Sequence, residues 1–124
     1  MRIGNDDLIE SGTLTDMAQS ITGTPTYLGH ICNFAIQLVF TGLPVGSFKL
    51  QVSSDEGSPT QAAPGNYANV THWSDVAGST QAITAAGTHM WEVADSGNCW
   101  VRFVYTRVSG TGTLTSAICN IKGV

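Results

Sequence analysis

The sequence has few charged residues. Asp, Glu, Lys and Arg make up 11% of its 124 residues, whereas soluble domains usually carry about 25%. Thr, Ser, Gly, Ala and Gln take their place. Because an uncharged polar surface loses less when water is removed from it, this composition favours a protein that packs against neighbours. An extracellular or salt-tolerant β domain explains the composition equally well.

Clusters of basic residues and long apolar runs are also missing. The net charge is -4, and the basic residues are scattered, so we expect no nucleic-acid partner. No apolar run approaches the length of a membrane span, and residues 1–7 lack the hydrophobic segment of a signal peptide. We therefore expect a protein made in a host cytoplasm, and we interpret the sequon at Asn69 as chance.

Cysteine is rare and shows no metal-binding spacing. Cys32, Cys99 and Cys119 are odd in number, each lies in or beside an apolar run, and no C-x-x-C motif occurs. Zinc sites need closely spaced Cys and His ligands. We expect three buried free thiols and no metal or other cofactor.

Helical periodicity is absent over any three turns, and alternation with period two replaces it. In the segment 99–108, Val101, Phe103 and Tyr105 share one face, which is typical of a half-buried strand. The segments 113–121, 31–40 and 47–53 alternate in the same way. Gly-rich turns between these segments predict two hairpins, one over 91–122 and one over 31–53.

Shorter strands are expected at 13–22, 70–76, 80–84 and 88–93. About eight strands, with turns every 8 to 12 residues, predict an all-β fold: a single antiparallel β-sandwich with the strand count of a jelly roll. Residues 13–124 form this domain, residues 1–12 are expected to be a flexible arm or a weak first strand, and residues 58–69 a long surface loop. The predicted core is Phe34, Ile36, Leu38, Phe48, Leu50, Trp91, Val101, Phe103 and Tyr105.

Four motifs follow one another along the chain: Thr41-Gly-x-x-x-Gly46, the strand Phe48–Gly57, Trp73-Ser-Asp-Val-Ala-Gly78, and the strand Trp100–Arg107 with Ser-Gly-Thr-Gly-Thr after it. In this order they resemble the motifs of small β-sandwich virion proteins of tailed bacteriophages. The resemblance covers about residues 13 to 122, and Glu56 departs from the family's usual Asp-Gly turn. The motifs are structural, so the resemblance implies a fold and a virion setting, as in capsid decoration, head-fibre or tail-associated proteins.

Residues that could carry chemistry have simpler explanations. Asp55, Glu56, Asp75 and Asp95 could bind Ca²⁺, but Asp is an ordinary turn residue. His30, His72 and His89 are expected at the surface. Ser74, His72 and Asp75 do not make a triad, because adjacent strand residues point to opposite faces and no nucleophile elbow is present. We expect no enzymatic activity.

We expect a capsid decoration or cement protein that bridges major capsid subunits or binds another virion protein, as a homo-oligomer and most simply a trimer. The alternative is a head-fibre or tail-tip module whose 58–69 loop binds host glycans. Aromatic side chains anchor such contacts; Trp91 and Trp100 are expected in the core, and Trp73 and Tyr67 at the surface. The candidate partner-binding residues are Arg2, Ile3, Leu8, Ile9, Tyr67, Trp73, Arg102 and Arg107.

Overall fold

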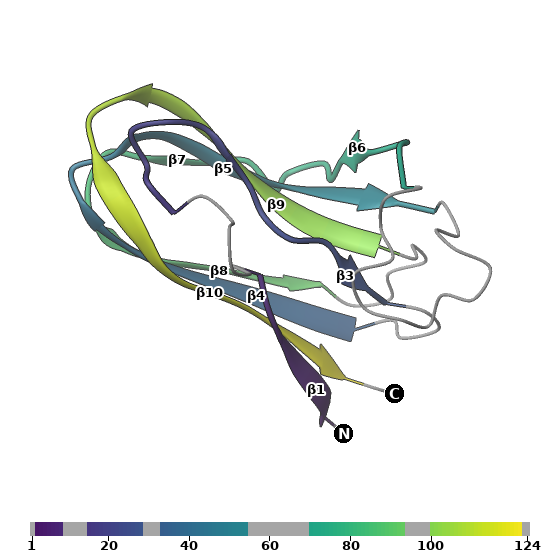
Figure 1. Cartoon of the computed structure of the whole chain (residues 1–124). Coiled ribbons are helices and arrows are strands. Elements are labelled where there is room, and N and C mark those ends of the chain that lie inside the picture. Colours follow the sequence, from purple (N-terminus) through teal and green to yellow (C-terminus); the bar gives the residue numbers. More distant parts are fainter. Residues whose placement is uncertain (1, 9–14, 29–32, 55–69, 94–99, 123–124) are drawn as a thin grey trace.

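A computed structural model describes residues 2–8, 15–28, 33–54, 70–93 and 100–122, and these residues contain strands and no helix. The strands form two sheets packed face to face (Figure 1). Within the described residues no helix is therefore long and apolar enough to span a membrane. The strands are β1 (Arg2–Asp7), β2 (Ile21–Thr22), β3 (Thr26–Tyr27), β4 (Asn33–Gly42), β5 (Val45–Ser53), β6 (Ser74–Asp75), β7 (Gln81–Ile83), β8 (Gly87–Val93), β9 (Trp100–Ser109) and β10 (Gly112–Lys122).

The first sheet has the order β1-β10-β4-β8, and the second has the order β2-β9-β5-β6, with β3 also paired to β9 and β7 to β5. Every pairing is antiparallel. When β2 and β3 are taken as one interrupted strand, and β6 and β7 as another, the chain fills eight positions in jelly-roll order. The prediction of an all-β antiparallel sandwich is confirmed.

Both predicted hairpins are wrong. β4 and β5 lie in different sheets, and so do β9 and β10; β4 instead pairs with β10, and β5 with β9. Period-two alternation determines which face of a strand is buried, but a turn followed by a second strand fits a hairpin and a crossing between sheets equally well. Each connection is a corner that passes from one layer to the other (Figure 1).

The two corners are bonded to each other at one end of the sandwich. The backbone N–H of Leu43 donates to the carbonyl of Thr111 over 2.8 Å, and Gly42 pairs with Gly112. Gly110 has a φ of 74°, and a Cβ there would lie 2.2 Å from the Leu43 carbonyl oxygen. Glycine is therefore required at Gly110 by its conformation and by the close approach of the other corner.

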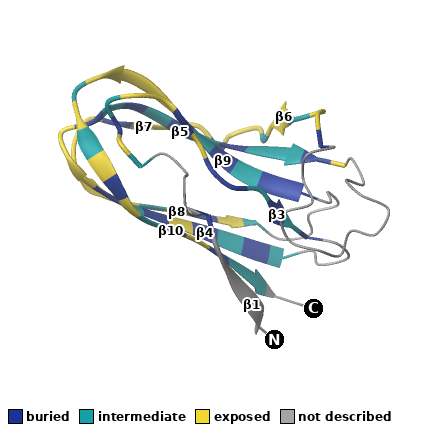
Figure 2. Ribbon diagram, viewed as in Figure 1, coloured by how far each residue is buried: buried dark blue, intermediate teal, exposed yellow. Residues whose placement is uncertain are grey.

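The core lies between the sheets, and all nine residues predicted for it are buried (Figure 2). Phe48 occupies its centre, with ring centroids 5.0 to 6.5 Å from those of four other aromatic residues. Trp91 and Trp100 are buried as predicted. Cys119 is buried and is not part of a disulfide, as predicted, while Cys32 and Cys99 lie outside the described residues. Further buried residues are Leu8, Met17, Ile21, Leu28, Phe40, Leu114 and Ala117.

The N-terminal residues differ from the flexible arm that the sequence predicts. Arg2–Asp7 is an edge strand bonded to β10, and the following Leu8 is fully buried, with its N–H donating to the Ala117 carbonyl over 2.8 Å. Residues 2–8 therefore belong to the sandwich, in line with the weaker alternative of a first strand, and residues 9–12 lie outside the described residues. The strands expected at 13–22 and 70–76 shrink to β2 and β6.

Candidate functional site

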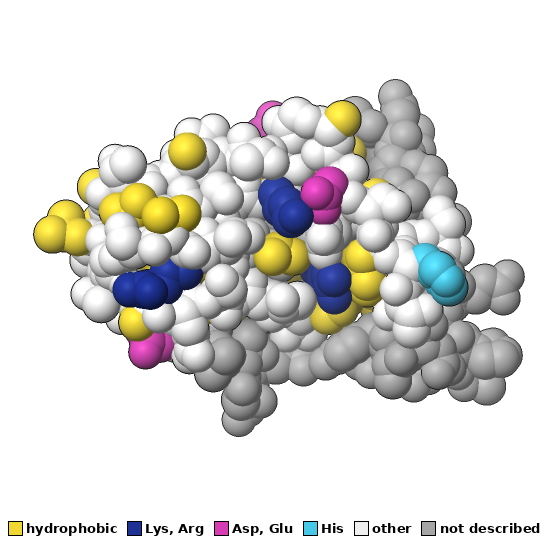
Figure 3. Space-filling model, turned by 90° about the horizontal axis from the view of Figure 1, so that it is seen from above, with side chains coloured by type: hydrophobic (Ala, Val, Ile, Leu, Met, Phe, Trp, Pro, Cys, Tyr) yellow, Lys and Arg dark blue, Asp and Glu magenta, His cyan; other side chains and the backbone are white. Residues whose placement is uncertain are grey.

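A row of polar side chains crosses the outer face of the second sheet. In β5, buried Phe48 and Leu50 alternate with Lys49 and Gln51, so the latter two point outward. The strand register places Gln51 between Asp75 of β6 and Arg102 of β9. Figure 3 shows one group of Lys, Arg and acidic side chains near the middle of this face, and others towards its left end and its edge.

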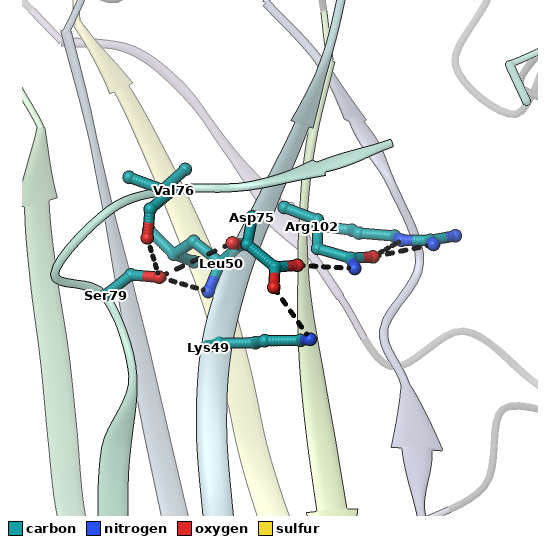
Figure 4. Close-up of polar contacts among 7 residues, drawn as sticks. Lys49, Leu50, Asp75, Val76, Ser79 and Arg102 are labelled. Carbon is teal, nitrogen blue, oxygen red and sulfur yellow. Dashed lines mark hydrogen bonds and ion pairs between the residues drawn. The ribbon is translucent and has the colours of Figure 1, made fainter. Parts of the chain in front are cut away.

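Hydrogen bonds connect this row from end to end. Asp75 accepts from Lys49 Nζ at 3.1 Å and from Gln51 Nε2 at 2.9 Å, and the Gln51 amide oxygen accepts from Arg102 Nε at 2.9 Å and Nη2 at 2.7 Å (Figure 4). The bonds from Gln51 and Lys49 lower the pKa of the Asp75 carboxyl below its ordinary value. Gln51 thereby has its amide orientation fixed on both sides.

Asp75 is held in place by the buried hydroxyl of Ser79, which follows β6 in the chain. Ser79 Oγ accepts from the Leu50 N–H at 3.0 Å and donates to the Val76 carbonyl at 2.7 Å, and the Val76 N–H donates to the Leu50 carbonyl at 2.9 Å (Figure 4). The Trp91 indole of the opposite sheet donates to the Ser79 carbonyl at 2.8 Å. The short strand β6 is thus attached to both layers of the core.

Arg102 ends the row above an indole ring. Its Cζ lies 4.1 Å from the centroid of the Trp73 ring, a cation–π contact. Trp73 is itself held by a 3.2 Å bond from its Nε1 to the Val70 carbonyl. Partial burial lowers the pKa of the Arg102 guanidinium, which nevertheless stays protonated, as arginine does in proteins. The structure therefore contains a partly buried cation whose hydrogen-bond acceptor is a neutral amide.

A pocket of about 320 Å³ opens beside Trp73 and Arg102. The connection between β2 and β3 forms its other wall, and this connection is fixed by the Gly23 N–H, which donates to the Phe103 carbonyl at 3.0 Å, and by the Thr24 N–H, which donates to the Leu8 carbonyl at 3.0 Å. The pocket is lined by hydroxyl groups, apolar side chains and one guanidinium group. Its lining residues are Thr22, Gly23, Thr24, Pro25, Val70, Trp73 and Arg102.

The outer face of the first sheet has a different chemistry. Gln37 of β4 is again the centre of a row, but its neighbours are Met90 of β8 and Ile118 of β10, whose side chains are 47% and 37% exposed. Among the described side chains of β4, β8 and β10, Glu92 is the one carboxylate, and Lys and Arg are absent. The described side chains of β4, β8 and β10 therefore give this face little charge and two exposed apolar groups, while the side chains of β1 and of Lys122 lie outside the description.

Two of the predicted partner-binding residues, Trp73 and Arg102, are brought together by the structure, with Trp73 partly buried rather than exposed. Arg107 lies at the corner end, where Nε and Nη2 donate to the Gly110 carbonyl at 3.1 and 3.0 Å. Leu8 was a wrong prediction, since a fully buried side chain offers nothing to a partner. Arg2 and Ile3 lie in β1 with side chains outside the description, and Ile9 and Tyr67 lie outside the described residues.

Gln51 was missed by sequence reasoning, although its outward position in an alternating strand was a usable signal. Lys49 and the 22–25 segment were missed as well. The register of β5 with β6 and β9 brings Lys49 and Gln51 beside Asp75 and Arg102, and the pairing of β2 with β9 brings the 22–25 segment to the same place. The sequence alone contains neither register.

The candidate metal and catalytic residues do not assemble among the described residues. Asp75 is engaged by Lys49 and Gln51, no group of three metal-ligating side chains occurs in the described part of the chain, and Asp55, Glu56 and Asp95 lie outside it. His72 Nδ1 is 3.2 Å from the hydroxyl of Thr71.

His89 is half-buried, whereas the sequence predicts a surface histidine. It packs edge-on against Trp91 with ring centroids 4.5 Å apart, and its Nε2 is buried without a hydrogen-bond partner. This burial lowers the pKa of the imidazole.

Comparisons with known proteins connect the fold to a phage-derived protein. No family model and no curated protein matches the chain. Among solved structures, the crystal structure of SPBc2 prophage-derived protein YomS matches with a TM-score of 0.55 and 14% identity, covering 98% of this chain and 96% of that one. The likeness extends over the whole sandwich and shows that the two proteins share a fold.

Proposed function

We propose that this chain is a structural protein of a bacteriophage particle, made in the host cytoplasm, that decorates the head by binding the major capsid protein. The prophage origin of the YomS protein, which has the same fold at 14% identity, supports the phage setting. The motifs Phe48–Gly57 and Trp100–Arg107, which resemble those of phage virion proteins, support it independently. Jelly rolls are frequent in viral capsids.

The outer face of the first sheet is the observation that carries the decorating role. Met90, Gln37 and Ile118 lie side by side across three strands, and Glu92 is the one ionised side chain described on these strands. A partner that covers the described side chains of β4, β8 and β10 on this face desolvates one carboxylate, so apolar contact there is offset by little electrostatic cost. A broad protein surface is the occupant that such a sheet face suits.

The exposed edge of the same sheet supports assembly with copies of the chain. β8 is an edge strand of seven residues, bonded to β4 on one side. It has no Lys or Pro, the residues that commonly protect edges from pairing. We place contacts between copies, in a trimer, along this edge, and capsid contact on the outer face beside it.

The mechanism in this proposal is mechanical. Each copy adds buried area across a joint between capsid subunits, and a stable interface buries about 1,600 Å² in total. Several copies joined to one another bind with an avidity greater than that of one copy. Because residues 2–8 belong to the sandwich, the binding element in this proposal is the outer face of the sheet and not a flexible N-terminal arm.

Particles of the phage that encodes the chain provide the test. Purified particles should contain the protein cross-linked to the major capsid protein, and an added purified protein should bind expanded shells. Ile118→Glu should weaken shell binding at least tenfold, because it places a charge on the face that the capsid would cover. Val108→Glu is the matched control, since Val108 is 72% exposed on the second sheet and should bind normally.

The protein's absence from purified particles would overturn the proposal. Equal shell binding by both variants, each with an unchanged melting temperature, would overturn the assignment of the face. Sedimentation of the free protein checks the trimer separately.

A further inference from the structure

We propose that the pocket beside Trp73 and Arg102 is a binding site for an acidic saccharide, whose carboxylate is held by the Arg102 guanidinium. The site lies on the outer face of the second sheet, on the opposite side of the sandwich from the face proposed to bind the capsid. It is thus accessible on a protein attached through the first sheet, and the inference does not depend on that attachment.

The Arg102 guanidinium is oriented before any ligand arrives. Nε and Nη2 share the Gln51 oxygen at 2.9 and 2.7 Å, and the Trp73 ring supports the guanidinium plane at 4.1 Å. Nη1 makes no hydrogen bond to the described residues and remains available as a donor. A planar fork fixed in this way loses little conformational freedom when it binds a carboxylate.

The charges around the pocket favour an anion. Asp75, the carboxylate nearest to Arg102 in the row, forms an ion pair with Lys49. Arg102 instead donates to the neutral amide oxygen of Gln51. The Arg102 guanidinium in the pocket wall is therefore partly desolvated, and no carboxylate among the described residues forms an ion pair with it. An incoming carboxylate would supply that charge through a charge-assisted hydrogen bond, which is stronger than a neutral one.

The remaining lining fits a sugar ring. Thr22 and Thr24 contribute hydroxyl groups, and Pro25, Val70 and Trp73 contribute apolar surface, which match the mixed polar and apolar surface of a pyranose. The volume of about 320 Å³ lies at the small end of ligand pockets and is suited to one ring. Arg102 is the one cation among the described lining residues, so a carboxylate fits better than a doubly charged phosphate.

Glucuronic acid and glucose make a matched pair of probes, because they differ in the carboxylate alone. Titration of the ¹⁵N-labelled full chain should give saturable NMR shifts at the Trp73 indole N–H with glucuronic acid, and glucose should bind at least tenfold more weakly. The Trp91 and Trp100 indoles are buried internal controls and should not shift. Acetate should also bind at least tenfold more weakly, since it lacks the ring.

Arg102→Gln should weaken glucuronic acid binding at least tenfold and leave glucose binding unchanged. Arg102→Lys should give an intermediate loss, because it keeps the charge and loses the fork. Arg107→Gln is the matched control: Arg107 is an exposed arginine of the same strand at the corner end, and its loss should leave binding unchanged.

Three results would overturn the inference. Equal affinity for glucose would show that the carboxylate is not recognised. Equal affinity for acetate or inorganic phosphate would show that the sugar ring is not recognised. The absence of saturable shifts would show that the pocket does not bind an acidic saccharide. Spectra that are unchanged away from the pocket confirm that each variant is folded. Shell binding by Arg102→Gln should be normal, so failure of this site and failure of the capsid proposal are distinguishable.

Discussion

Gln37 and Gln51 hold equivalent positions on the two outer faces of the sandwich. Each is the middle residue of a row that crosses three strands, and each points away from the core. Gln37 lies between Met90 and Ile118, whereas Gln51 lies between Asp75 and Arg102 and bonds to both. The same residue type thus lies in an uncharged row on one sheet and connects a charged network on the other.

This difference teaches how one fold can offer two kinds of contact. A neutral, flat face suits a large partner, because it can be covered without removing water from charges. A fixed cation beside a pocket suits a small charged ligand, because its orientation is already determined. The two faces share one core, so their chemistry can vary independently while the scaffold stays the same.

Loss of the shared core should give the largest effect and should affect both faces together. Phe48 contacts aromatic residues from both sheets, so Phe48→Ala should lower the free energy of unfolding by about 3–5 kcal/mol. Urea unfolding followed by NMR should show reporters on both faces, the Trp73 indole and the Gln37 side-chain amide, disappearing at one midpoint. Two separate midpoints would contradict the idea of a single scaffold.

A matched pair of substitutions tests the comparison directly. Gln51→Leu removes the acceptor of the partly buried Arg102 guanidinium and should cost about 1 kcal/mol of stability. This is less than the roughly 1.5–3 kcal/mol of hydrogen bonds to charged groups, because the site is partly solvated. Gln37→Leu removes no side-chain bond found in the structure and should stay within about 0.5 kcal/mol of the original protein. If chemical denaturation showed equal losses of unfolding free energy in the two variants, the hydrogen bonds of Gln51 would not contribute to stability.

The smallest effect concerns pH and the edge of the first sheet. Burial lowers the pKa of His89 below its ordinary value of 6.5, so the folded protein binds fewer protons than the unfolded chain. The contribution of His89 to the free energy of unfolding is fully present above pH 6.5. It decreases as the pH falls below 6.5 and becomes constant again below the pKa of His89 in the folded protein. His89→Gln should therefore flatten the decrease in melting temperature between pH 7 and pH 5.

Much of the fold could be predicted because alternation reports burial directly. Phe34, Ile36 and Leu38 had to share a face whatever the topology, and the same holds for Val101 and Phe103. Strand partners were not predictable in this way: β4 and β10 meet through register and sheet order, which local patterns do not encode. β1 shows the same limit, since Arg-Ile-Gly-Asn-Asp-Asp has weak strand character and pairs because β10 offers it an open edge.

The candidate site was only partly readable for a related reason. Trp73 and Arg102 could be selected as individual residues, but their contact depends on the position of β6 beside β5, which the buried Ser79 fixes. The pocket wall at 22–25 gave no chemical signal of its own. Sites assembled from three or more strands become visible when the register is known.

The bonded corners have a consequence for how the chain folds. They bring together Thr41 and Thr113, which are 72 residues apart in the sequence, and neither corner can be completed by its own neighbours in the chain. Closing so long a loop costs entropy before the contact returns any stability. Folding should therefore occur in milliseconds to seconds, as in other β-sandwiches rich in distant contacts, with most of the chain already collapsed when this end closes.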